Sequence, residues 1–274
     1  MNSQLHFDKI LAFLDGPDSP DISNPIHSTA GAANYGFKGA LVGGATVFGW
    51  ATPLILETLG TDWLRKGWAS ISFRRPTYPG EELTISLEPT GPQEFLLKIS
   101  GADGDDRLKG EIGIGMAPWL SEIVDTEISK AAVSDTELPL LTLSIAPIGQ
   151  TLSPLGDPLS VPDAISYGAD KQRSKDELFV GEKPIAHPGW ICARPIRFLH
   201  HSYNYSPAIH AKSRIQFFGE IHAGENIVTT GTFVEAYERK GHTYGVVDCS
   251  TFNSLGVEVI RQRHTTIFAV GARE

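Results

Sequence analysis

One histidine stands in a polar turn directly before a long uncharged run. Residues 24–27 read Asn-Pro-Ile-His, and the run from Gly39 to Leu56 carries no charge. Histidine titrates near neutral pH and can take or give a proton. A carboxylate or amide that is hydrogen-bonded to it would fix its tautomer. His27 is therefore a candidate acid–base group, with Asp21 or Asn24 as its partner.

The same turn also has a purely structural interpretation. An asparagine followed by proline commonly begins a turn, and an aspartate often stabilises one through its own backbone. A turn histidine can simply bond to backbone groups. From the residues alone, both interpretations of His27, Asp21 and Asn24 stay open.

The uncharged run predicts a buried helix that begins near Gly44. Its length approaches a membrane span, but three glycines and Pro53 interrupt it. Backbone N–H groups at a helix start have no partner inside the helix and suit a negatively charged oxygen. Gly44 and Ala45 would supply such groups, and glycine allows a ligand to approach closely. The alternative is that the glycines serve only tight packing between helix and sheet.

Alternating apolar and polar residues predict strands after this helix. The predicted strands span 69–73, 83–87, 95–99 and 112–116, and in the second half 228–236, 244–252 and 257–270. Near the start of the chain, apolar residues at helical spacing predict a short helix; they are Phe7, Ile10, Leu11, Phe13 and Leu14. A long helix followed by antiparallel strands indicates an α+β fold.

An offset of 144 residues aligns the first half of the chain with the second. It pairs Ile71 with Ile215 and Gly80 with Gly224, and both halves show an uncharged run, a strand, a Gly-Glu turn and further strands. Five prolines between 139 and 162 favour a linker or an extended edge. We therefore expect an N-terminal domain at 1–138, a linker at 139–162 and a C-terminal domain at 163–274, as two copies of one fold.

The turn and the helix start together resemble the signature of MaoC-like dehydratases and R-specific enoyl-CoA hydratases. That motif runs Asp-x-Asn-Pro-x-His, then a small residue, then Gly-Phe, then a glycine that opens the central helix. Residues 24–27, Ala33, Gly36-Phe37 and Gly44 match it, and the segments 73–83, 187–190 and 264–268 are similar to parts of two-domain members. The resemblance implies a double hot-dog fold, in which two antiparallel sheets, each wrapped round a central helix, lie side by side.

Two positions depart from the family pattern. The family's catalytic aspartate lies five residues before the histidine, where this chain has Ile22, and Asp21 stands one residue further away. The family's acidic residue two positions after the histidine is Thr29 here. In the second half, Gly168 and Lys171 stand at the offset positions of the motif's asparagine and histidine. At most one site of the family type is expected, in the first half.

The resemblance implies a lyase of fatty-acid metabolism, a hydratase or dehydratase that interconverts 2-enoyl and 3-hydroxyacyl thioesters. An acyl-coenzyme A thioester would be its substrate, and no cofactor is implied. His27, Asp21 and Asn24 would do the acid–base work, and Gly44 and Ala45 would bind the thioester oxygen. Two alternatives stay open: an acyl-CoA thioesterase, because the fold serves both activities, and a non-catalytic acyl-ligand binding protein, which the displaced aspartate favours. The acyl chain, its carrier and the direction of reaction are left undetermined.

Further residues are candidates for binding. Arg74 and Arg75 could hold the phosphates of coenzyme A, although arginines at strand ends are usually solvated. His187, Trp190 and Tyr203 could line a pocket in the second half, or His187 could be a buried hydrogen-bonding group at the second helix start. No pair of histidines four residues apart lies near an acid, so no metal site is expected.

The composition is that of an ordinary globular protein, with 41% hydrophobic and 20% charged residues. The formal net charge of −9 argues against a general nucleic-acid binder. Two cysteines are too few for a disulfide scaffold. No signal segment opens the chain, so a cytoplasmic protein without a membrane partner is expected. Association into a homodimer is a further expectation.

Overall fold

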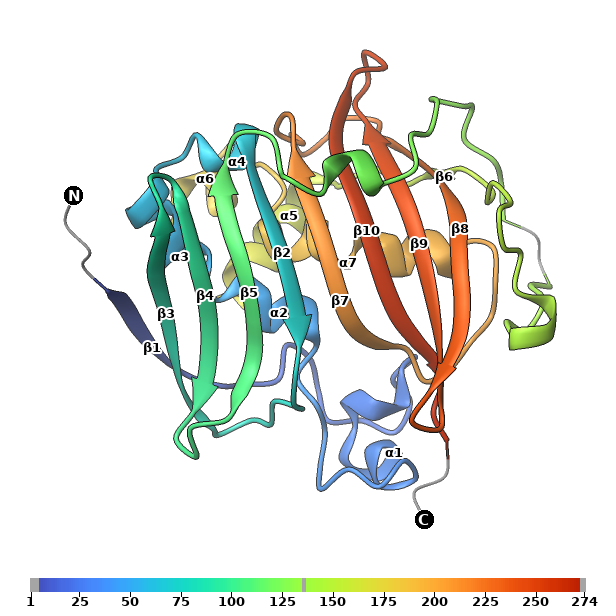
Figure 1. The fold of residues 1–274 in the computed structure, drawn as a ribbon, viewed down its shortest axis with the longest axis horizontal. Coiled ribbons are helices and arrows are strands. Elements are labelled where there is room, and N and C mark those ends of the chain that lie inside the picture. Colours follow the sequence, from blue (N-terminus) through green and yellow to red (C-terminus); the bar gives the residue numbers. More distant parts are fainter. Residues whose placement is uncertain (1–4, 135–136, 272–274) are drawn as a thin grey trace.

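Ten antiparallel strands form one continuous sheet in the computed structural model, which describes residues 5–134 and 137–271 (Figure 1). In spatial order the strands are β1 (His6–Leu11), β3 (Glu82–Gly91), β4 (Glu94–Gly101), β5 (Asp106–Ile114), β2 (Gly67–Phe73), β7 (Ile209–Phe217), β10 (Glu258–Ala269), β9 (His242–Phe252), β8 (Val228–Arg239) and β6 (Leu155–Gly156). The first five strands come from the first half of the chain and the last five from the second. Strands β2 and β7 therefore form a seam between two half-sheets.

The seam is centred on the 144-residue offset. In the antiparallel pairing of β2 with β7, Ser70 stands opposite Arg214 and Ile71 stands opposite Ser213. Ser70 and Arg214 are 144 positions apart, so this residue faces its own counterpart in the other half. The two halves are thus related by an approximate twofold axis through this pair. The predicted α+β architecture, with two sheets side by side, is confirmed.

Three helical segments lie against one face of the sheet (Figure 1). They are α2 (Gly44–Gly49) and α3 (Thr52–Leu59) in the first half and α7 (Pro188–His200) in the second, and α2 packs against α7. The predicted single helix is in two pieces because Pro53 has no N–H group with which to continue the helical hydrogen bonds. Residues of all three helical segments and of both half-sheets share one core cluster, which includes Phe48 and Ile191.

Short helices connect these elements. The loop before α2 contains η1 (Pro25–His27) and α1 (Thr29–Ala33), and α4 (Trp63–Lys66) leads into β2. The long connection between the halves contains η2 (Leu120–Glu122), η3 (Leu143–Ile145), α5 (Val161–Ser166), the π-helix η4 (Tyr167–Lys171) and α6 (Glu177–Val180). The loop with η1 and α1 hangs below the sheet, near the ends of β2 and β7 (Figure 1).

Two predictions at the strand level were wrong. The segment around Phe7 and Leu11 is the edge strand β1 and not a helix; it pairs with β3, and both side chains are exposed. Five apolar residues gave a weak helical period, which the pairing with a ready sheet edge overrides. The predicted strand 112–116 ends earlier, because β5 stops at Ile114 and Met116 is exposed. The other predicted strands are confirmed as β2, β3, β4, β8, β9 and β10.

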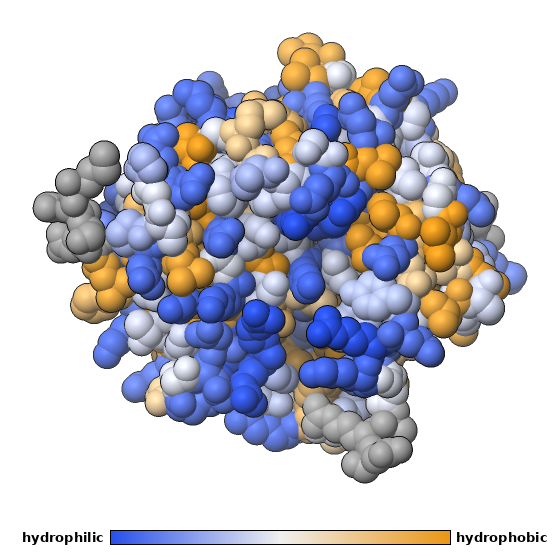
Figure 2. Space-filling model, viewed as in Figure 1, coloured by the Kyte–Doolittle hydropathy of each residue, from blue (hydrophilic) through white to orange (hydrophobic). Residues whose placement is uncertain are grey.

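The segment after β5 crosses the other face of the sheet (Figure 1). Trp119 packs edge-on against Trp68 with 6.2 Å between ring centroids, and the amide of Gln216 accepts a hydrogen bond from the backbone of Ala117. Figure 2 shows that hydrophilic side chains cover much of this face, with apolar ones scattered among them. This outward face is therefore mostly solvated, and the cavity described below lies elsewhere.

The proline-rich segment 139–162 includes β6, which pairs with β8 at the outer edge of the second half-sheet. It therefore contributes an extended edge, while the division of the chain into domains at 138 and 163 stays a prediction. No helix among the described residues has both the length and the apolar character needed to cross a membrane.

Candidate functional site

His27 is held in one tautomer by its surroundings. Its Nδ1 atom lies 2.8 Å from the carbonyl oxygen of Leu41, which can only accept a hydrogen bond, so Nδ1 carries the proton. In the neutral ring, Nε2 is then an acceptor, and the Nδ2 amide of Asn24 lies 3.3 Å from it. The backbone fixes this arrangement, because the N–H of Leu41 donates to the carbonyl of Ile26. The site thus presents a basic ring nitrogen next to an amide donor.

Asn24 also ties the turn to the second half of the chain. Its Nδ2 donates to the carbonyl oxygen of Ala208 at 2.7 Å, and its Oδ1 accepts from the N–H of Ala208 at 3.4 Å. Asn24 is the N-cap residue of η1 but makes no capping bond there. Its side chain is therefore committed to His27 and to the chain just before β7.

These residues line a cavity of about 630 Å³ at the start of α2. Gly43, Gly44, Ala45 and Thr46 form one wall, and the N–H groups of the first residues of α2 have no partner inside the helix. The predicted helix start is thus placed beside His27, and the geometry allows a negatively charged oxygen to lie there.

Close packing from both halves leaves little room for a side chain at position 44. A Cβ atom on Gly44 would lie 3.1 Å from the ring of Phe73 and 3.3 Å from the Cβ of His210. His210 reaches this place because the register of β7 against β10 skips Ala211, which turns His210 and Ser213 to the same face. Burial, and secondarily the nearby His264, lowers the pKa of His210 well below its usual value, so its ring is neutral.

A carboxylate enters the cavity from a part of the chain that the motif does not include. Asp15 lines it, and its Oδ2 accepts a hydrogen bond of 2.7 Å from the hydroxyl of Thr46. Asp21, the predicted partner of His27, is exposed and makes no side-chain hydrogen bond or ion pair to His27 within the described part of the chain. Asn24, the other predicted partner, is the residue that contacts the ring.

The equivalent helix start in the second half is closed. Pro188 stands at the first position of α7, where it supplies no N–H group, and the Nδ1 of His187 accepts from the N–H of Gly189 at 3.1 Å. The ring of Phe179 packs on His187 at 4.5 Å, and burial lowers the pKa of His187 to about 3. The donors that Gly44 and Ala45 offer in the first half are therefore missing or occupied here.

Comparison with solved structures agrees with this architecture. A MaoC-like dehydratase superposes with a TM-score of 0.57 at 16% identity over 90% of each chain. A putative MaoC domain protein dehydratase from Chloroflexus aurantiacus gives 0.57 at 12% identity over 91% of this chain and 88% of its own. A conserved hypothetical protein from Mycobacterium tuberculosis, described as having a double hotdog fold, gives 0.56 at 15% identity, over 86% of this chain and 84% of its own. The chain has the double hot-dog fold. No protein-family model and no curated protein sequence matches it.

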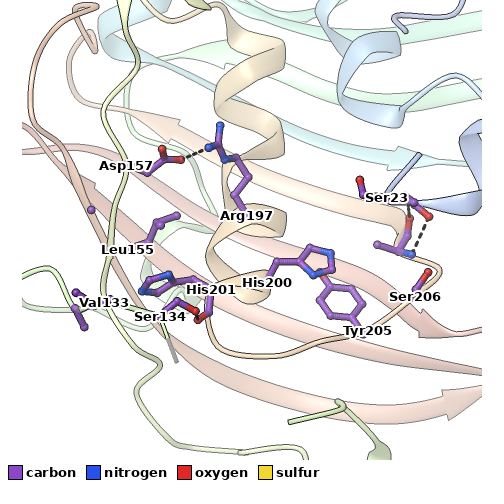
Figure 3. Close-up of a pocket in the computed structure, with 14 residues that line it drawn as sticks. Ser23, Val133, Ser134, Leu155, Asp157, Arg197, His200, His201, Tyr205 and Ser206 are labelled. Carbon is purple, nitrogen blue, oxygen red and sulfur yellow. Dashed lines mark hydrogen bonds and ion pairs between the residues drawn. The ribbon is translucent and has the colours of Figure 1, made fainter. Parts of the chain in front are cut away.

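A second cavity, of about 770 Å³, adjoins the first and is lined mostly by residues of the second half (Figure 3). The two cavities share Asn24 and His200 in their linings. Figure 3 shows His200 stacked on Tyr205, with the ion pair of Arg197 and Asp157 on the far side. The ring centroids of the stacked pair are 4.0 Å apart, and burial lowers the pKa of His200. A ligand group that passes Asn24 would enter this second space.

Positive charge gathers in the lining of the first cavity. Arg74, Arg75, Lys171 and Lys240 line it, and all four side chains belong to exposed residues. Arg75 is paired with Asp105 at 3.0 Å. The two arginines thus lie where the sequence prediction needs them, together with two lysines that it did not include.

The other predicted pocket residues lie elsewhere. Neither His187 nor Trp190 is among the described residues that line the two cavities. Both are buried at the N-terminal end of α7. Tyr203 lines a separate, smaller cavity of about 170 Å³. Asp15 was missed, because it does not belong to the motif and only the folded chain brings it to the start of α2. No group of three or more metal-ligating side chains gathers among the residues that the structure describes.

Proposed function

We propose that this chain interconverts 2-enoyl and 3-hydroxyacyl thioesters by adding or removing water. The observation that carries the proposal is the fixed tautomer of His27, whose basic Nε2 stands beside the Asn24 amide in a cavity at the start of α2. Addition of water beside a thioester needs a base for the water, a proton for the neighbouring carbon and donors for the enolate oxygen. The cavity offers a group for each task.

The proposed steps balance with one histidine. A water that takes the place of the Asn24 amide at Nε2 of His27 attacks the third acyl carbon while Nε2 takes one of its protons. The electrons of the double bond move to the thioester oxygen, which lies at the N–H groups of Gly44 and Ala45, where the helix end favours negative charge. His27 then returns the proton to the second carbon on the same face. The reverse sequence dehydrates a 3-hydroxyacyl thioester.

The surroundings support an acyl-coenzyme A type of substrate. Exposed cations at the first cavity, including Arg74 and Lys171, suit phosphate groups. The second cavity beyond Asn24 gives room for the acyl group past the third carbon. The structural neighbours named as dehydratases share the fold at 16% and 12% identity, which makes the activity a reasonable proposal and leaves the site residues to carry it.

The test is loss of enoyl-thioester absorbance across a panel of acyl groups, offered on coenzyme A and on a carrier protein, with free thiol measured in parallel. His27→Ala should lower kcat by about 10²- to 10⁴-fold while the protein stays folded. His222→Ala is the matched control, because His222 is half exposed and lies outside both cavities.

Three results would contradict the proposal. Undiminished turnover in His27→Ala would remove His27 from the chemistry. Release of free thiol without change at the double bond would indicate a thioesterase. Binding of acyl thioesters without any turnover would indicate a binding protein.

A further inference from the structure

Asp15 and His27 approach the same point of the fold, although twelve positions separate them in the chain. The Oδ2 atom of Asp15 and the Cε1 atom of His27 lie 4.0 Å and 3.8 Å from the point that a Cβ atom on Gly43 would occupy. The carboxylate and the imidazole therefore stand close to one point, at the residue that precedes α2. Both line the same cavity.

The bonding of Asp15 differs from that of a helix-capping carboxylate. A cap accepts hydrogen bonds from the backbone N–H groups of the first turn. Asp15 instead accepts from the side-chain hydroxyl of Thr46, which is buried in that turn, at 2.7 Å. The backbone donors of Gly44 and Ala45 are left for another oxygen, and no described residue hydrogen-bonds to the Oδ1 atom of Asp15. The contact with Thr46 orients the carboxylate through Oδ2 and leaves Oδ1 without a hydrogen bond from the described residues.

The charge of Asp15 also stands out from its surroundings. It is the one acidic side chain among the described residues that line this cavity, where Arg74, Arg75, Lys171 and Lys240 are basic. A carboxylate weakens the attraction of such a cavity for an anionic substrate. A carboxylate that Thr46 orients, and that shares a cavity with an imidazole, can hold a water for activation.

We propose that Asp15 is the second catalytic residue of the site and orients the same water that His27 deprotonates; this inference rests on the function proposed above. In hydration, Asp15 accepts a hydrogen bond from the water proton that stays on the new hydroxyl. The other proton passes to Nε2 of His27 and then to the second acyl carbon. Asp15 remains ionised throughout and stabilises the positive imidazole while it holds the proton. The bond to Thr46 makes Thr46 a positioning residue.

The test compares Asp15→Asn with Asp21→Asn. Asp21 is the acid that the sequence motif favours, and it is exposed on the same loop, so it is a matched control. Asp15→Asn keeps an oxygen for the Thr46 hydroxyl and should lower kcat by about 10²-fold or more with little change in KM. Asp21→Asn should match the wild type. Asp15→Glu should recover part of the lost kcat, because it restores the carboxylate, and this rescue separates chemistry from mere support of the helix.

The possible outcomes distinguish a failure of this inference from a failure of the proposed function. If the wild type is active and Asp15→Asn has the same kcat, this inference alone is overturned. A loss in Asp21→Asn without a loss in Asp15→Asn would return the role to the motif position. Absence of wild-type turnover on the whole thioester panel would overturn the proposed function and this inference with it. If Asp15→Asn has a lower thermal midpoint, its loss of activity could come from misfolding, and Asp15→Glu becomes the deciding variant. A stable Asp15→Glu protein without any activity would also overturn the inference.

Discussion

At the scale of single residues, Asn24 connects chemistry and assembly. One amide contacts the ring of His27 and both backbone groups of Ala208, 184 positions further along the chain. The turn that carries His27 is therefore held by the second half, although the second half supplies no part of the motif. An amide suits this place because it donates and accepts at once, which a carboxylate cannot do when ionised.

This double use predicts two effects of Asn24→Ala. The carbonyl of Ala208 would lose its donor in a largely buried place, which should lower the free energy of unfolding by about 1–3 kcal/mol. Turnover should fall as well, because the ring of His27 loses its partner. Urea midpoints and kcat measure the two effects. Asn34→Ala is the control, since Asn34 is exposed in the same loop, and an equal loss of stability there would contradict the argument.

Sequence reasoning at this scale was limited by distance along the chain. The motif brought out His27 and Asn24, which lie within one turn and contact each other. Its spacing favoured Asp21 and passed over Asp15 and Asp18 in the same polar stretch. The folded chain separates them: Asp18 binds Thr29 and Asp21 is exposed, while only Asp15 lines the cavity.

At the scale of elements, the two helix starts explain why one half has the site. The start of α2 is built from glycine and alanine next to a cavity, and the start of α7 is closed by Pro188 and His187. The repeat predicted both helices and the seam strands, because the chain from helix to first strand has the same length in each half. It failed further on, where β8 and β9 are longer than β3 and β4 and the offset changes.

The closed helix start gives a prediction for His187→Ala. The variant removes the acceptor of the Gly189 N–H bond, which should cost about 0.5–2 kcal/mol of stability, and kcat should stay at the wild-type value. Thermal midpoints and initial rates of His187→Ala and His27→Ala, measured side by side, form the check. If His187→Ala abolished turnover and His27→Ala did not, the working site would belong to the second half.

At the scale of the whole molecule, three buried histidines make stability depend on pH. Burial lowers the pKa of His187 and of His264 to about 3, and that of His210 well below its usual value. The unfolded chain protonates these rings below about pH 6.5, whereas the folded chain keeps them neutral. Unfolding therefore takes up protons, and stability falls as the pH drops from neutral towards the folded pKa values.

Each such ring should contribute up to about 1.4 kcal/mol per pH unit to that fall. Urea midpoints measured at pH 8, 7, 6 and 5 should be flat above pH 7 and should decline steeply below it. In His264→Gln one titrating ring is gone, so the decline should be shallower by about one proton. Equal slopes in the variant and the wild type would mean that His264 is protonated in the folded protein.

The pairing of Ser70 with Arg214 at the seam has a consequence for how this protein can change. In a dimer of identical chains, every substitution is made in both sites at once, so neither site can be given up without loss of the other. Covalent linkage of the halves ends that constraint. Pro188 and His187 close the helix start of the second half and leave the start of α2 unchanged. Strand β7 of the second half instead packs beside the start of α2. The two helix starts can thus be mutated, or engineered, separately, although Ala208 and His210 of the second half keep their contacts with the first.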